Sequence, residues 1–337
     1  MSLFGQLDVR LDPWAVEYGS ELPLGAALDD EPQPDVDPEV ELSRGAWEPL
    51  VPAHDTPAPP RLAFVDGVRR IEARVLVRHA QTLAHGAFGS FGVGAVLSED
   101  GRAAIVEARA ERVLALGAGL SLPAAVHVSP ALAYEPLSTS ETKPDAPLAR
   151  LQEAMRAAEE ALAQRLAQQG DTLVVCDGPL RPSAFAGHGA GTTLGYVKRL
   201  FETYLDPALL RVVARLPAGA RTPLIALRAP QRFARLAWFL RLAAPHPGDI
   251  DLAGLVRLEV RDGVGVEAAR RLADATARLL PRFAPSRGRD PRAPQNLLPI
   301  GALEQHLRRL LGDPRVVRRH IEAVLRAPRR VEELKPA

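Results

Sequence analysis

The sequence predicts an α/β fold in which a mixed sheet, an antiparallel meander followed by parallel strands, is flanked by helices and preceded by an extended arm. Three observations lead to this prediction. Short apolar or alternating runs are separated by glycine-bearing turns between residues 61 and 97. Apolar stripes with helical spacing then alternate with further short apolar runs as far as residue 325. The 337 residues, 47% of them hydrophobic, are enough to bury a substantial core.

The arm comes first. Residues 1–60 are rich in proline and acidic residues, which is typical of an extended or loosely packed segment. It also holds four large apolar residues: Trp14, Tyr18, Trp47 and Leu50. A free linker has little use for such side chains, so we expect them to dock onto the body or onto a partner. The main domain is predicted over residues 61–330.

The body is predicted to begin with the meander. Its strands are expected at 61–66, 71–77 and 91–97 because these runs are apolar or alternate in polarity. Residues 103–118 and 148–169 follow as predicted helices. Further strands are expected at 172–176, near 192–200, and at 222–228, 235–242 and 255–260. Helices are expected at 207–216, 265–280, 300–311 and 314–325, with a proline-rich loop at 284–296.

Charge and cysteine content narrow the functional classes. The net charge is only +1, so no global basic field indicates a nucleic-acid partner, and none is excluded. The single cysteine, Cys176, excludes an intramolecular disulfide and any multi-cysteine metal site, which fits a reducing compartment. No apolar run approaches the length of about 18 residues that a membrane helix needs, and no signal-peptide pattern opens the chain. We therefore expect a cytoplasmic protein.

Two short apolar runs end in the same dipeptide. Leu62-Ala63-Phe64-Val65 precedes Asp66-Gly67, and Leu173-Val174-Val175-Cys176 precedes Asp177-Gly178. A strand that is apolar on both faces is normally central in a sheet, so each aspartate is expected where the interior meets solvent. A carboxylate in that position costs free energy unless a positive group stands opposite. One such pair is more often an ordinary Asp-Gly turn, but its repetition favours a shared cation site.

The predicted helix at 148–169 carries an acid on its apolar face. At about 100° per residue, Glu159 falls inside the apolar stripe, whereas Glu160 points away. The stripe consists of Leu148, Leu151, Met155, Leu162 and Leu166. A charged residue on an inward face more often marks a paired or metal-binding group than a solvated one. Glu159 could equally reach the edge of the stripe or pair with one of the many arginines.

Asp66, Glu159 and Asp177 would together bring three acids to one end of the sheet. Carboxylate oxygens are the ligands that Mg²⁺ and Mn²⁺ prefer. Two such ions, about 3.5–4 Å apart, activate a water and stabilise a departing oxygen in phosphodiester hydrolysis. The three acids therefore predict a metal-dependent nuclease.

Two further residues are candidates for this site. Lys198 is one of three lysines in a chain that otherwise uses arginine, and a compact ammonium suits a single phosphate oxygen; the alternative is an exposed strand lysine. His306 lies at the border of an apolar helical stripe. It could bind metal, contact the phosphate, or be a histidine whose hydrogen bonds are satisfied within the fold, and the spacing favours the last.

The order of these motifs resembles the NurA nucleases. After the two Asp-Gly strands and the helix between them come Gly195-Tyr196-Val197-Lys198 and then Asn296-Leu297-Leu298-Pro299, before a helix with Leu303 and His306. The second Asp-Gly is part of Asp177-Gly178-Pro179-Leu180. The resemblance covers residues 61–325, and its specificity lies in the order of the motifs.

The resemblance implies an RNase H-like core related to the Piwi nuclease domain. It implies an Mn²⁺-dependent DNA nuclease, with Mg²⁺ as the alternative ion, that works as a homodimer with the hexameric translocase HerA in resecting DNA ends for recombinational repair. Exonuclease activity is implied, and endonuclease activity on single strands is left open. Asp66, Glu159 and Asp177 would be metal ligands, with Glu160 as the alternative helix acid, and Lys198 and His306 would be auxiliary site residues.

Two other classes stay open. The glycine-rich segment 187–193 resembles a phosphate-binding turn, and actin-like ATPases and sugar kinases also place Asp-Gly at strand ends. Those proteins need a hydroxyl-bearing loop after the first Asp-Gly, and Val68-Arg69-Arg70 supplies none. The other alternative is a non-catalytic assembly protein in which both Asp-Gly pairs only turn the chain. Binding of divalent ions would argue against that alternative.

Overall fold

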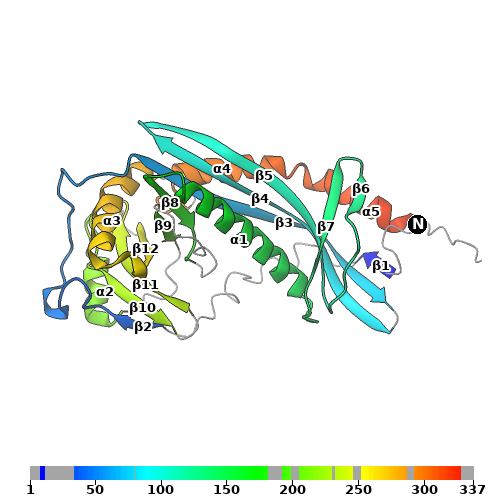
Figure 1. Cartoon of the computed structure of the whole chain (residues 1–337), viewed down its shortest axis with the longest axis horizontal. Coiled ribbons are helices and arrows are strands. Elements are labelled where there is room, and N and C mark those ends of the chain that lie inside the picture. Colours follow the sequence, from blue (N-terminus) through cyan, green and yellow to red (C-terminus); the bar gives the residue numbers. More distant parts are fainter. Residues whose placement is uncertain are drawn as a thin grey trace, which may run out of the picture.

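The structure, a computed structural model, describes residues 8–11, 34–79, 81–180, 192–198, 205–229, 232–245, 252–286 and 292–327. Its centre is a mixed sheet of 12 strands flanked by helices, which confirms the predicted α/β class (Figure 1). The molecule is elongated, because the strands of the meander are much longer than the others. Among the described residues, no helix is long and apolar enough to cross a membrane.

The strands are β1 (Asp8–Leu11), β2 (Asp35–Asp37), β3 (Arg61–His79), β4 (Thr82–Glu99), β5 (Arg102–Leu116), β6 (Val126–Ser129), β7 (Leu132–Ser138), β8 (Thr172–Asp177), β9 (Thr192–Val197), β10 (Ile225–Ala229), β11 (Arg232–Arg241) and β12 (Leu255–Arg261). The helices are α1 (Ala146–Ala167), α2 (Pro207–Ala214), α3 (Val266–Leu279), α4 (Leu298–Leu310) and α5 (Pro314–Arg326). Short 3₁₀ turns lie at Arg44–Ala46, Asp262–Val264 and Leu280–Phe283.

The central strands of the sheet follow the predicted order. β3, β4 and β5 form an antiparallel meander, and β8 then pairs in parallel with β3. β9 pairs in parallel with β8, so the strands run β5-β4-β3-β8-β9. This is the RNase H-like arrangement of three antiparallel strands, a helix and two parallel strands. β12, β11, β10 and β2 extend it as antiparallel strands beyond β9.

Two predictions about the meander are wrong. Residues 103–118 do not form a helix, because β5 occupies them and pairs with β4 over nearly its whole length. Their alanines, glutamates and arginines favour a helix locally, but the pairing overrides that preference. The runs 61–66 and 71–77 are one strand, β3, in which an irregularity between Ile71 and Ala73 absorbs the break in pattern. Asp66-Gly67 therefore lies within a strand and does not end one.

Two helices cover opposite faces of β3. α1 packs over Ala63 and Val65, and α4 packs over Leu62 and Phe64, because successive side chains of a strand point to opposite faces. Gly94 of β4 lets α4 approach closely: a Cβ there would stand 2.9 Å from Leu303 Cδ1 and 2.6 Å from the Glu107 carbonyl oxygen. Each helix can thus bring a side chain to β3 from its own side.

Residues 34–50 of the predicted arm pack against the β10–β11 end of the sheet. β2 pairs with β10, and Trp47 is buried in the apolar cluster that includes Val213 and Phe239. Glu41 accepts two hydrogen bonds of 2.9 Å from the guanidinium of Arg221, whose side chain is only 2% exposed. This part of the arm is packed, whereas Trp14 and Tyr18 lie outside the described residues.

We expect Glu41→Ala to lower the free energy of unfolding by about 3 kcal/mol, because it removes a partner of a buried charge. Arg221 would keep one acidic partner, Asp274, whose Oδ1 lies 2.7 Å from its Nε, and the carbonyl oxygen of Thr222. The matched control is Asp37→Ala, since the ion pair of Asp37 with Arg228 is exposed and 3.6 Å long. Denaturant unfolding should show a loss below about 1 kcal/mol for that variant. Equal losses for both variants would contradict the expectation.

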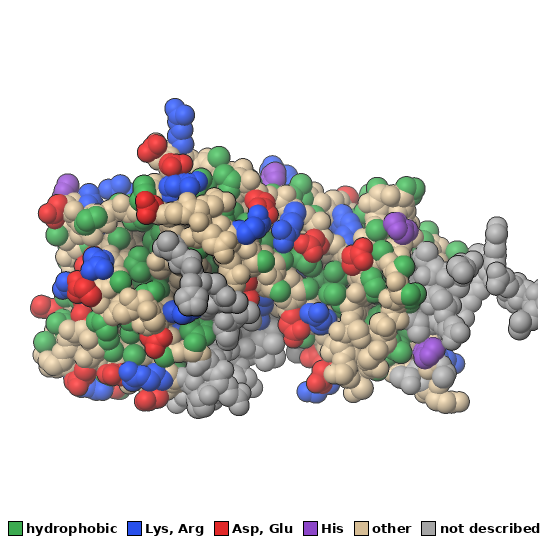
Figure 2. Space-filling view, viewed as in Figure 1, with side chains coloured by type: hydrophobic (Ala, Val, Ile, Leu, Met, Phe, Trp, Pro, Cys, Tyr) green, Lys and Arg blue, Asp and Glu red, His purple; other side chains and the backbone are tan. Residues whose placement is uncertain are grey.

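Charged side chains of both signs are interspersed over the surface. Figure 2 shows basic and acidic groups side by side on the visible face, without one large field of either sign. This agrees with the net charge of +1. Any attraction for a charged ligand must therefore come from a local arrangement.

Candidate metal centre

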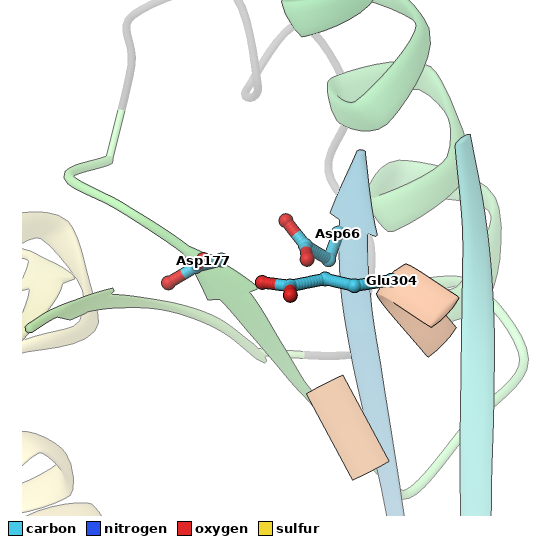
Figure 3. A group of neighbouring side chains, drawn as sticks. All are labelled: Asp66, Asp177 and Glu304. Carbon is cyan, nitrogen blue, oxygen red and sulfur yellow. The ribbon is translucent and has the colours of Figure 1, made fainter. Parts of the chain in front are cut away.

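Three carboxylates meet at the point where β8 ends beside β3. Asp66, Asp177 and Glu304 each offer an oxygen, and these oxygens all lie within 4.8 Å of one another. Figure 3 shows the three side chains near one another, with Glu304 of α4 reaching past Asp66 of β3 toward the end of β8, which carries Asp177. Asp66 is 6% exposed and Glu304 is 7% exposed, so the cluster is largely withdrawn from solvent.

The register of the sheet explains why the two aspartates meet. β8 runs parallel to β3, with Val65 opposite Cys176 as the last pair of the ladder. Asp66 and Asp177 are the next residues on each strand, and neighbouring strands lie about 4.8 Å apart. Residues in register on adjacent strands point to the same face. Two carboxylates at these positions are therefore brought together by strand pairing alone.

α4 supplies the third acid from the face that it covers. Glu304 lies in the stripe of α4 that packs inward, together with the buried Ile300, Leu303 and Leu307. The contact of Leu303 with Gly94 holds this helix close to the sheet. Glu304 therefore reaches Asp66 from above the same face of β3.

The cluster is electrostatically strained when fully ionised. Burial raises the pKa of Asp66 well above its ordinary value, and the neighbouring Asp177 and Glu159 raise it further. Burial also raises the pKa of Asp177, although Lys198 opposes the shift. Like charges in a poorly solvated site favour protonation unless a cation is present. A bound cation would therefore stabilise the ionised form of the three carboxylates.

Two basic side chains supply part of that charge. Lys198 Nζ lies 2.7 Å from Asp177 Oδ2 and 2.7 Å from Asn296 Oδ1. Arg292 donates two hydrogen bonds to Glu304, of 2.8 and 2.6 Å. Among the described residues, no cationic side chain makes a salt bridge with Asp66. The most buried acid of the cluster is the one that lacks such a partner.

Glu159 approaches the cluster from the other face of β3. The predicted stripe of α1 is buried at Leu148, Leu151, Met155, Leu162 and Leu166. Glu159 lies against Gly67, where an added Cβ would stand 2.3 Å from its Oε1, and its charge contributes to the raised pKa of Asp66. It is not one of the three acids within 4.8 Å of one another. Burial raises the pKa of the Cys176 thiol, and the charges of Glu159 and Glu160 raise it further, so both glutamates lie near the end of β8.

The structure does not bring His306 into the cluster. It is half-buried on α4, two residues after Glu304, and side chains two apart do not share a helix face. Sequence reasoning considered His306 and missed Glu304. The signal was present, because Glu304 lies within the stripe of Ile300, Leu303, Leu307 and Leu311, as Glu159 lies within that of α1. Arg292 and its pairing with Glu304 were also missed.

The glycine-rich segment 187–193 lies outside the described residues, apart from Thr192 and Thr193 at the start of β9. The phosphate-binding turn of the actin-like alternative is therefore not tested by the described residues.

The solved structures that are similar to this one include three nucleases. One is the NurA nuclease from Sulfolobus solfataricus, with a TM-score of 0.44, 14% identity, and coverage of 79% of this chain and 86% of that chain. The catalytic domain of human endonuclease V gives a TM-score of 0.31 at 16% identity, covering 75% and 84% of the two chains. Endonuclease V from Bacillus subtilis gives 0.32 at 13% identity, covering 77% and 87%. Likenesses at this level carry no argument about activity.

No protein-family model matches the chain, and no curated protein matches it. The chemistry of the site must therefore be judged from its own residues.

Proposed function

We propose that this protein is a divalent-metal-dependent nuclease that hydrolyses phosphodiester bonds in DNA. The observation that carries the proposal is the meeting of Asp66, Asp177 and Glu304 within 4.8 Å. Hard cations such as Mg²⁺ and Mn²⁺ prefer oxygen ligands, and a carboxylate cluster of this kind is the usual protein contribution to their sites.

The donor set fits such an ion. All three groups are carboxylates, and no cysteine or histidine is among them. The buried Asp66 has a pKa raised by burial and by neighbouring acids, and this penalty would be offset by a cation bound between the three side chains. Divalent ions in such a site activate an attacking water and stabilise the departing oxygen of a phosphodiester.

The surrounding residues have distinct roles in this proposal. Asp66, Asp177 and Glu304 hold the metal, and Arg292 fixes the orientation of Glu304 through its two hydrogen bonds. Lys198 stands next to Asp177, and in this proposal its ammonium contacts a phosphate oxygen of the substrate. Glu159 lies against Gly67 on the face of β3 that α1 covers, and Asp66 points to the other face. In this proposal the Glu159 carboxylate orients the attacking water or holds a second ion.

Finer parts of the proposal rest on the motif order that resembles the NurA nucleases. These are Mn²⁺ as the preferred ion, a homodimer, a HerA-type hexameric translocase as the partner, and a cytoplasmic role in DNA end resection. An auxiliary role for His306 belongs to the same group, because the acidic cluster itself does not include it.

The test is an assay of end-labelled DNA with the full chain in Mn²⁺, Mg²⁺ or EDTA. We expect cleavage with Mn²⁺ or Mg²⁺, none in EDTA, and recovery when the ion is returned in excess. Cleavage that persists in EDTA, or no cleavage with either ion, would sink the proposal. Tight binding of ATP together with inactivity on DNA would favour the actin-like alternative.

The role of Glu159 can be tested through its neighbour. In Gly67→Ala the added Cβ would stand 2.3 Å from Glu159 Oε1 and 3.2 Å from the Gly92 carbonyl oxygen, so the flexible Glu159 carboxylate should be displaced while β4 yields by a few tenths of an ångström. We expect cleavage to slow by about 10- to 100-fold, as for other residues that support a metal site. Gly45→Ala is the control, since nothing lies within 4 Å of a Cβ at that position.

Single-turnover rates of Gly67→Ala, Glu159→Gln and the double variant separate the two effects. If Gly67→Ala acts by moving Glu159, the double variant should be no slower than the slower single variant. Losses that multiply in the double variant would show that Gly67 acts independently of Glu159.

A further inference from the structure

A stretch of β3 beside the acidic cluster has one free edge. β8 pairs with β3 only over residues 61–65, and β1 pairs with it only over residues 75–78. Between them, no described strand pairs with residues 66–74 on that side, although β4 pairs along the other side. Free backbone groups of a strand can accept a ligand or another chain.

A groove lies along this free edge. It has a volume of about 630 Å³, and α1 and α4 form its walls. Gly67 and Glu304 line one end, so the groove begins at the acidic cluster. It then passes Arg69 and Arg308 and reaches Gly312, beyond the end of α4. A volume of this size is within the range of about 300–1,000 Å³ that holds small-molecule ligands.

Two arginines that line the groove, Arg69 and Arg308, have no partner among the described residues. Arg69 is half-buried, and burial lowers its pKa. Arg308 lies on α4 one helical turn after Glu304, so it stands above the groove on the side of the cluster. Neither side chain makes a hydrogen bond or ion pair with another residue of the described part of the chain.

Arg70 lines the same groove and shows the contrast. Its guanidinium donates to Glu72 and to the carbonyl oxygens of Leu311 and Gly312, at 2.7 to 2.9 Å. Arg70 thus ties the end of α4 to β3. Arg69 and Arg308 have no such structural task.

We propose that this groove is the subsite for one strand of nucleic acid next to the cleaved bond, with Arg69 and Arg308 binding its phosphates. The inference rests on the proposed nuclease function. A free guanidinium binds a phosphate through paired N–H donors, and the two arginines flank a path that ends at the carboxylates. A single strand exposes its phosphates along one backbone, so we expect it to enter the groove unpaired.

The test compares Arg69→Ala and Arg308→Ala with Arg309→Ala in the full chain. Arg309 is the matched control, because it is an exposed arginine of α4 that does not line the groove. A fluorescein-labelled single-stranded oligonucleotide is titrated in EDTA at several salt concentrations. We expect each groove variant to bind about tenfold more weakly, with a salt dependence that is smaller by about 0.7 in the log–log slope. Arg309→Ala should leave both quantities unchanged.

Two further readouts separate this inference from the nuclease proposal. The shift that Mn²⁺ causes in the unfolding midpoint should be the same in both groove variants as in the wild type, which shows an intact metal centre. If the wild type cleaves DNA and both groove variants bind the oligonucleotide as tightly as the wild type, the proposed nucleic-acid subsite is wrong and the nuclease proposal is unaffected. If the groove variants bind more weakly but the wild type does not cleave DNA with any ion, the nucleic-acid subsite is supported and the nuclease proposal is wrong. Equal losses in Arg309→Ala, or equally tight binding of a fully paired duplex, would also overturn the groove.

Discussion

Replacing Glu304 with glutamine should slow metal-dependent DNA cleavage by at least about a thousandfold, because a metal ligand contributes several kcal/mol to the transition state and each 1.4 kcal/mol is tenfold in rate. Glutamine keeps the size of the side chain and removes its charge. The three carboxylates would become two, and the affinity for Mn²⁺ should fall along with the rate. Asp66→Ala and Asp177→Ala should have effects of the same order.

Glu304→Gln is the cleanest of these variants because its partner is accessible to water. The side chain of Arg292 is 46% exposed, so it can be solvated when Glu304 no longer carries a charge. Lys198, the partner of Asp177, is only 15% exposed and would be left with Asn296 alone. We therefore expect Glu304→Gln to unfold at nearly the wild-type denaturant concentration.

The measurement is the single-turnover rate on end-labelled DNA at saturating Mn²⁺. Glu267→Gln is the control, since Glu267 is 63% exposed and pairs only with neighbours on α3. It should cleave at the wild-type rate. Glu304→Gln that retains more than about a tenth of the rate would exclude Glu304 from the metal centre, since that loss amounts to only about 1.4 kcal/mol.

The meeting of Asp66 and Asp177 could be predicted from sequence because strand pairing is enough to cause it. Two apolar runs that end in the same dipeptide are expected to be neighbouring central strands, and their ends then lie at one place. The prediction survived an error about the first run. β3 continues far beyond Asp66. The pairing of β8 with β3 stops at Val65 and Cys176, so Asp66 and Asp177 are the first residues after the paired segment.

Glu304 shows what a helical stripe can and cannot tell. The stripe of α4 reveals that Glu304 faces inward, yet it does not reveal which strand lies beneath it. That depends on Gly94 of β4, which admits Leu303 to the sheet, and on the register of β4 with β3. The partner Arg292 comes from a proline-rich loop with no periodicity to read.

The wrong helix at 103–118 has a different cause. Alanine, glutamate and arginine favour a helix when only local preferences count. β5 is a strand because β4 offers it a long ladder of hydrogen bonds, and its ion pairs of Arg109 with Glu107 and Glu111 join residues two apart on one strand face. The pairing of Glu41 with Arg221 spans 180 residues and likewise has no local signature.

Asp66→Asn should make the metal-free protein more stable at pH 8 while abolishing its response to Mn²⁺. Burial and the charges of Asp177 and Glu159 raise the pKa of Asp66, so the folded state binds its proton more tightly than the unfolded chain does. Stability is therefore lost as the pH rises from about 4, the pKa of an unperturbed aspartate, through the raised pKa of the folded protein. Asparagine is neutral at every pH and does not incur this cost.

We expect the free energy of unfolding to rise by about 1–3 kcal/mol at pH 8 in EDTA, and by less at pH 5. Mn²⁺ at a hundredfold excess over its dissociation constant should stabilise the wild type by about 2.7 kcal/mol and leave the variant unchanged. Glu153→Gln, an exposed acid of α1, is the control and should keep the wild-type response. Denaturant unfolding at both pH values, with and without Mn²⁺, measures all of these quantities. If Asp66→Asn is less stable than the wild type in EDTA, or if Mn²⁺ raises its free energy of unfolding as much as that of the wild type, then Asp66 does not bind the metal ion.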